Sequence, residues 1–146
     1  MNREETIKFL ALVKVAYPTA FKDMDNMSKQ ATVNMWQSTF SSAPYPIVEM
    51  AFNGFRLTSK YPPTVAEMVL ELKHLHWKAV EDSIRAISFG RQEDVLACEW
   101  VMKHTEAYKN EDFIKTPVYA SVKKLAGVSI AGALEGREND NDTQVN

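Results

Sequence analysis

The sequence of 146 residues has one cysteine, five glycines and no long apolar run, and each shortage excludes a class of structure. With Cys98 alone the chain cannot form an internal disulfide or a zinc site built from several cysteines. We expect Cys98 to be a buried, small hydrophobic residue in a reducing compartment. The glycine spacing matches neither the phosphate-binding loop nor the dinucleotide fingerprint. No apolar stretch is long enough to cross a bilayer, and the N-terminal segment lacks the pattern of a signal peptide. These features predict a cytoplasmic protein without membrane contact.

The sequence also lacks the residue groupings that catalysis or metal binding requires. On a helix, His74 and His76 would point about 200° apart, and neither has a carboxylate four residues later that would complete a metal-binding face. The acidic pairs Glu81-Asp82 and Glu93-Asp94 are sequence neighbours, and neighbours on a helix do not face a common point. We therefore predict no catalytic residues, no metal site and no cofactor, and we expect that the protein is not an enzyme.

The charge balance argues against a strong grip on nucleic acid. The formal net charge is -2, and residues 77–146 hold nine basic against twelve acidic side chains. Binding to a phosphate backbone depends on lysine and arginine, so we do not expect direct nucleic-acid binding.

The stretch KYPPTVAEMVLELKHL, residues 60–75, fixes one helix boundary from several signals. Pro62 and Pro63 must end the preceding helix near Ser59. Thr64 and Glu67 have the spacing of a capping box, which begins a new helix. Apolar residues then follow at intervals of three and four as far as Ile87, and Gly90 is a natural C-terminal stop. The pattern predicts one long helix over about residues 64–90.

Similar patterns predict helices elsewhere. Residues 3–16 begin with a capping pair, Asn2 and Glu5, and carry apolar Ile7, Leu10 and Val13 at helical spacing. Further helices are expected over residues 28–41, from Pro46 through Phe55, over 94–107 and over about 116–125. The second of these stripes includes Ala31, Met35, Trp36 and Phe40; the third includes Ile47, Val48, Ala51, Phe52 and Phe55; the fifth includes Val95, Leu96, Cys98, Val101 and Met102.

No strand pattern persists, so the fold class is all-α: a small bundle of about four helices, a further helical C-terminal part, and an acidic tail expected to be disordered. We divide the chain into a helical bundle domain at residues 1–76, a helical C-terminal extension at 77–126 and a flexible tail at 127–146. The extension is expected to attach loosely. Helical spacing makes Trp36, Phe40, Phe52 and Phe55 core residues in preference to an exposed aromatic patch.

A few side chains outside the first core are candidates for contact with a partner protein. Trp77 and Trp100 are hard to place in that core, and tryptophan is enriched at interfaces. Three further candidates lie in the last apolar segment: Tyr119, Lys123 and Lys124. Lysines near an aromatic ring could instead be a solvated face.

The N-terminal half resembles the phage replicative-helicase loader/inhibitor family. The resemblance depends on the order and spacing of several pieces, among which the AYP, W-x-x-x-F and PPT-x-x-E elements carry most weight. The matching pieces are Glu4-Glu5-Thr6-Ile7, Leu10-Ala11-Leu12-Val13-Lys14, Ala16-Tyr17-Pro18, Phe21-Lys22-Asp23-Met24, Val33-Asn34-Met35-Trp36 with Phe40, and Tyr61-Pro62-Pro63-Thr64-Val65-Ala66-Glu67.

The resemblance implies a small helical protein that acts in the cytoplasm of a bacterial host. Such a protein binds a hexameric replicative helicase, restrains its ATPase activity and DNA loading, and delivers it to an origin-bound replication protein. In that family the C-terminal part contributes to helicase contact, but residues beyond 76 carry no motif that we can match.

Two other functions fit the sequence. A DNA-binding replication accessory protein would place a later helix in a groove, and tight duplex binding with a steep salt dependence would reveal it. A phage protein that inhibits a host enzyme or defence complex by surface mimicry would explain the acidic tail, and a pull-down would recover that complex in place of a helicase.

Overall fold

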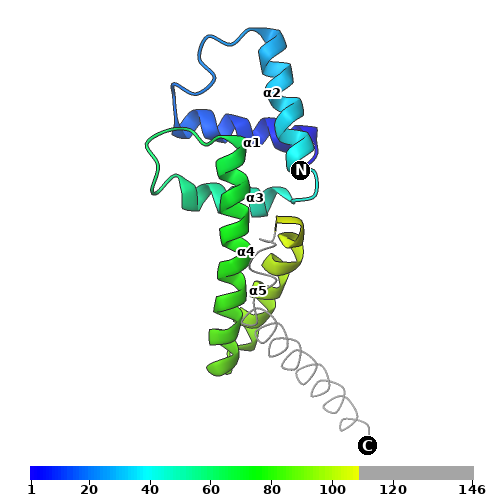
Figure 1. Ribbon diagram of the computed structural model, residues 1–146, viewed down its shortest axis with the longest axis vertical. Coiled ribbons are helices and arrows are strands. Elements are labelled where there is room, and N and C mark those ends of the chain that lie inside the picture. The colour runs from blue at the N-terminus through cyan, green and yellow to red at the C-terminus, as the bar shows by residue number, and fades with distance from the viewer. Residues whose placement is uncertain (109–146) are drawn as a thin grey trace, which may run out of the picture.

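The computed structural model of the chain describes residues 1–108, and every regular element in this part is helical (Figure 1). The predicted all-α class is thereby confirmed. The predicted helix at 116–125 and the tail at 127–146 lie outside the described residues. None of the helices in residues 1–108 combines the length and hydrophobicity that a membrane span requires. The elements are α1 (Arg3–Ala16), α2 (Asn26–Thr39), α3 (Tyr45–Phe55), α4 (Val65–Ser88), α5 (Gln92–His104) and a short 3-10 turn, η1 (Glu106–Tyr108).

Local capping chemistry places α1 and α4 where the sequence predicted them. The Asn2 side chain accepts from the Glu5 amide, and the Glu5 carboxylate accepts from the Asn2 amide at 2.8 Å. Thr64 and Glu67 form the same reciprocal box at the start of α4. Two orphan amides are satisfied at each helix start, so the chain needs no tertiary contact to define these boundaries.

Helices α2 and α3 differ from their predicted limits by a few residues. Helix α2 begins at Asn26 because the Asp25 carboxylate accepts from the Ser28 amide at 2.6 Å, and the chain leaves the helix after Thr39. The prolines at 62 and 63 require a stop near Ser59, but α3 already ends at Phe55, and a short turn covers the residues between.

Helix α4 runs without interruption to Ser88, and Gly90 follows it at φ +67°, as expected of a helix stop. Helix α5 then starts two residues earlier than predicted and ends at His104. The chain does not continue as an α-helix to residue 107, because Thr105 caps α5 and η1 takes the next three residues.

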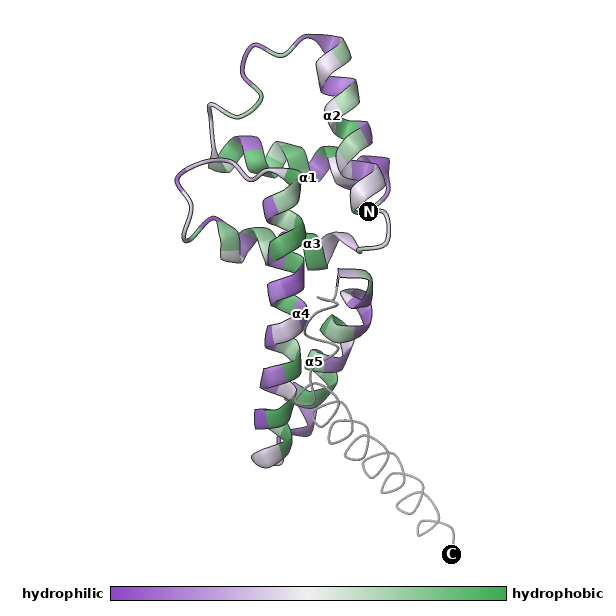
Figure 2. Cartoon of the chain, in the orientation of Figure 1, coloured by the Kyte–Doolittle hydropathy of each residue, from purple (hydrophilic) through white to green (hydrophobic). Residues whose placement is uncertain are grey.

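The main core lies where α1, α2 and α3 meet the first half of α4, and Figure 2 shows hydrophobic residues gathered where α3 and α4 cross. Aromatic rings form its centre: the Phe9 ring lies 5.4 Å from Trp36 and 5.5 Å from Phe52. Trp36 in turn lies 5.4 Å from Phe40. The prediction that Trp36, Phe40, Phe52 and Phe55 are core residues is confirmed.

Three residues assigned to apolar stripes are exposed instead: Ile7, Ala31 and Met35. Helices α1 and α2 each have few neighbours, so only a narrow edge of each is covered. Beside that edge, the Arg3 guanidinium donates to the side chains of Asn34, at 2.8 Å, and Gln30. Polar contacts therefore occupy part of the surface that a wider apolar interface would have covered.

Helix α4 connects the core to the rest of the described chain. Met68 and Leu72 in its first half are fully buried in the core, and its second half lies beside α5 (Figure 1). The helix is continuous across residue 76. The division into domains at that residue therefore remains a prediction.

Candidate functional site

The second half of α4 and α5 form a helical hairpin that the N-terminal core does not enclose. Its inner side is lined by small residues, which let the two helices approach closely. On α4 these are Ala79, Val80, Ser83 and Ala86, all buried, whereas α5 has no fully buried residue. The hairpin consequently presents much of its side-chain surface to solvent.

A buried polar pair joins the two helices near the open end of α5. The Nδ1 atom of His76 lies 2.7 Å from the Thr105 Oγ1 atom, and Thr105 Oγ1 also lies 2.7 Å from the Val101 carbonyl oxygen. A carbonyl only accepts, so the Thr105 hydroxyl donates to Val101 and accepts from His76. His76 therefore carries a proton on Nδ1.

Tyr108 attaches the hairpin to the core after α5 has ended. Its ring stacks on Phe40 with 6.2 Å between centroids, and its hydroxyl donates to the Thr39 carbonyl at 3.0 Å. Burial raises the pKa of the Tyr108 hydroxyl, and the hydrogen bond with Ser42 opposes this rise. The extension that was expected to attach loosely thus returns a buried side chain to the first core.

Cys98 lies on α5 and is half-buried, where the sequence predicted a fully buried residue. Burial raises the pKa of its thiol, and the nearby carboxylates of Asp82 and Asp94 raise it further. The thiolate is the reactive form of cysteine, so this surrounding disfavours nucleophilic chemistry at Cys98. The same carboxylates give this part of the hairpin a negative potential.

The structure separates the five predicted contact residues. Trp77 is half-buried on α4, and Trp100 is exposed on α5. Tyr119, Lys123 and Lys124 lie outside the described residues. The described structure therefore does not bring the five together into one site.

Leu96 is the residue that the sequence pattern misplaced. Its apparent stripe on α5 points inward through Val95, Cys98 and Val101, whereas Leu96 points outward and is 50% exposed. Its position four residues before Trp100 puts the two side chains on one face of the helix. That spacing is the signal in the sequence that could have revealed the pair.

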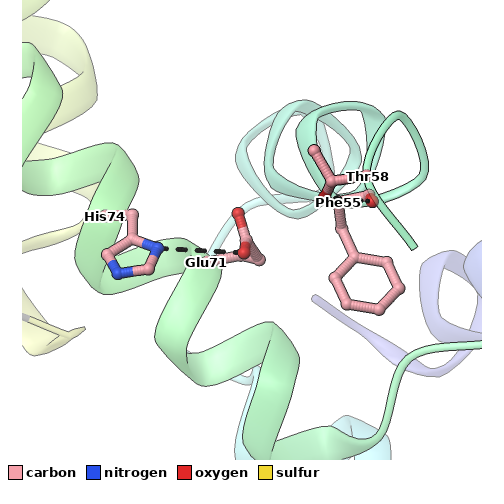
Figure 3. A network of polar contacts seen from close by, with 4 residues as sticks. All are labelled: Phe55, Thr58, Glu71 and His74. Carbon is pink, nitrogen blue, oxygen red and sulfur yellow. Dashed lines mark hydrogen bonds and ion pairs between the residues drawn. The ribbon is translucent and has the colours of Figure 1, made fainter.

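The polar contacts at the first half of α4 offer no metal site. The Nδ1 atom of His74 lies 3.8 Å from the Glu71 carboxylate, and Figure 3 shows the pair together with Thr58, whose hydroxyl donates to the Phe55 carbonyl. Across residues 1–108, no group of three or more His, Cys, Asp and Glu side chains is placed to hold a metal ion.

Comparison with known proteins gives one match, and it falls on the N-terminal core. No curated protein and no solved structure matches the chain. The family model for the N-terminal domain of the phage helicase loader/inhibitor matches residues 1–69, which span α1, α2, α3 and the first turn of α4. The resemblance noted in the sequence is confirmed, and residues 1–69 of this chain belong to that N-terminal domain family.

Proposed function

We propose that this protein binds a hexameric replicative helicase, restrains its ATPase activity and DNA loading, and delivers it to an origin-bound replication protein. The observation that carries the proposal is the family match over residues 1–69. The family implies a replicative helicase as the partner. The restraint, the delivery and the origin-bound protein are finer parts of the proposal.

The architecture supports a role in protein binding. The N-terminal domain is a closed core held by aromatic contacts, and the long α4 carries a hairpin away from it (Figure 1). Such an arrangement separates a stable scaffold from surfaces that are free to meet a partner. We propose that contact with the helicase involves the hairpin residues Trp77 and Trp100 and, beyond the described residues, Tyr119, Lys123 and Lys124.

The test is size-exclusion chromatography with light scattering of the full chain mixed with the replicative helicase of its own replication system, with and without ATP. We expect a complex whose stability depends on the nucleotide. A hexameric helicase from an unrelated replication system is the control for nonspecific association. If the cognate helicase forms no complex in either condition, the proposal is wrong.

A second measurement separates inhibition from delivery. We expect the protein to lower the ATPase rate of the helicase on single-stranded DNA. Addition of the origin-bound replication protein should then restore the rate and load the helicase onto DNA. An unchanged ATPase rate in a mixture that forms a complex would overturn the inhibitory part alone.

A further inference from the structure

The outer face of α5 carries two apolar side chains that the fold does not cover. Leu96 is 50% exposed and Trp100 is 40% exposed, although both belong to a helix packed against α4. The residues of α5 that face α4 are Val95, Cys98, Val101 and Met102, each half-buried. The helix therefore has an inner apolar side that α4 covers and an outer apolar pair that it leaves exposed.

The Trp100 side chain is held in place by its neighbour on the helix. The His104 ring lies 4.6 Å from the Trp100 ring, centroid to centroid. His104 Nδ1 lies 2.7 Å from the Trp100 carbonyl oxygen, which only accepts, so His104 donates to it. An anchor whose rotamer is fixed before binding loses less conformational entropy on association. Tryptophan in such a position is typical of the residues that dominate binding energy.

The surroundings of this pair are acidic. Glu93 lies one turn before Leu96 on the outer face, and Glu99 directly precedes Trp100. Arg91 does not offset these charges, because its guanidinium pairs with the Asp94 carboxylate at 3.4 Å. Over residues 77–108 the chain has four basic and six acidic side chains.

We propose that Leu96 and Trp100 form a docking surface for an apolar groove, bordered by lysine or arginine, on the helicase. This inference rests on the proposed function, because it assigns the surface to that partner. An acidic border around an apolar pair favours a partner of complementary charge. A second copy of this chain fits less well, because it would bring two acidic hairpins together.

The test compares two leucine-to-lysine variants of the full chain. Leu96→Lys places a positive charge on the docking surface, and Leu57→Lys makes the same change at a residue that is 82% exposed in the turn after α3. Helicase binding should weaken at least about tenfold for Leu96→Lys and less than about twofold for Leu57→Lys. Circular dichroism should show the same helix content for both. Equal binding by Leu96→Lys and the unchanged protein would overturn the docking surface.

A charge variant tests the chemistry of the partner separately. Glu93→Lys leaves both apolar side chains in place but reverses one charge on the acidic border. We expect slower association and a smaller dependence of the rate on salt concentration. Faster association of this variant would show that the border of the groove is acidic and would overturn the assignment.

A probe that needs no helicase keeps this inference distinct from the proposed function. The probe is a synthetic helix with leucines on one face and lysines on the other, and its affinity is measured by calorimetry. If the helicase does not bind but the probe binds the unchanged protein and not Leu96→Lys, the proposed function fails and the docking surface stands. If the probe binds both equally, the surface is wrong. Self-association of the protein that Leu96→Lys abolishes would also overturn it, because the occupant would then be a second copy.

Discussion

The Tyr108 hydroxyl lies 3.2 Å from the Ser42 hydroxyl, a contact between residues separated by 66 positions in the sequence. Ser42 closely follows the last turn of α2, and Tyr108 follows α5. The contact thus closes a path that leaves the core along α4 and returns along α5. Tyr108 is the last described residue, and its side chain ties the end of the described chain to the N-terminal core.

Substitution of Tyr108 should lower the free energy of unfolding in two steps. Tyr108→Phe removes the hydrogen bond to the Thr39 carbonyl and should cost about 1 kcal/mol. Tyr108→Ala also removes a buried ring and should cost about 3–5 kcal/mol. Urea unfolding followed by circular dichroism measures both differences.

The matched control is Tyr61, whose side chain is 75% exposed before the start of α4. Tyr61→Ala should change the free energy of unfolding by less than about 0.5 kcal/mol. If Tyr108→Ala is no more destabilising than Tyr61→Ala, the attachment of the hairpin through Tyr108 is wrong.

The Thr105 hydroxyl should matter more to stability than the Thr105 methyl group. Thr105→Val keeps the shape but leaves the His76 Nδ1 proton without this acceptor, which should cost about 1–3 kcal/mol. Thr105→Ser keeps the hydroxyl and loses one methyl group, at about 0.8 kcal/mol. Thermal unfolding of the two variants side by side should therefore rank Thr105→Ser above Thr105→Val. The reverse order would show that packing outweighs the buried hydrogen bond.

Local signals in the sequence predicted much of the fold. The capping boxes at Asn2 and Thr64 and the stop at Gly90 act within a few residues, so the sequence is sufficient to place α1 and α4. The apolar spacing of α3 identified a stripe that is buried throughout, because this helix meets both α1 and α4.

The orientation of α5 could not be predicted in the same way. Val95 and Leu96 are adjacent apolar residues, and a weak stripe can be drawn through either. Only the position of α4 decides that Val95 turns inward and Leu96 outward. The long-range contact of Tyr108 has no local signal at all. The candidate surface was therefore predicted in part, through Trp100, while its second member followed from packing.

The turn between α1 and α2 contains a backbone conformation that glycine should improve. Asp23 has φ +61° and an exposed side chain, and L-residues other than glycine adopt this left-handed region at a cost. Asp23→Gly should raise the free energy of unfolding by about 0.5–1 kcal/mol. Lys22→Gly, at a neighbouring position without positive φ, should lower it by a similar amount because glycine gains more entropy in the unfolded chain. Urea unfolding should give opposite signs for the two variants, and equal signs would contradict the strain at Asp23.

The capping box at the start of α4 should make stability depend on acidic pH. The backbone amide and hydroxyl of Thr64 donate to the Glu67 carboxylate and lower its pKa from the ordinary value of 4.5. The unfolded chain therefore takes up a proton at Glu67 at a higher pH than the folded chain does. The stability contributed by this group is fully present above about pH 4.5 and is lost as the pH falls through the folded pKa.

Glu67→Gln keeps a capping side chain but removes the titration, so the decline in unfolding free energy below about pH 4.5 should become shallower than in the unchanged protein. Part of the decline should remain, because hydrogen bonds from Ser28 also lower the pKa of Asp25. Glu81→Gln, at an exposed position in the second half of α4, makes the same charge change without touching a cap. Urea unfolding at a series of pH values compares the three proteins. An identical slope for Glu67→Gln and the unchanged protein would show that the capping carboxylate does not link the folding of α4 to pH.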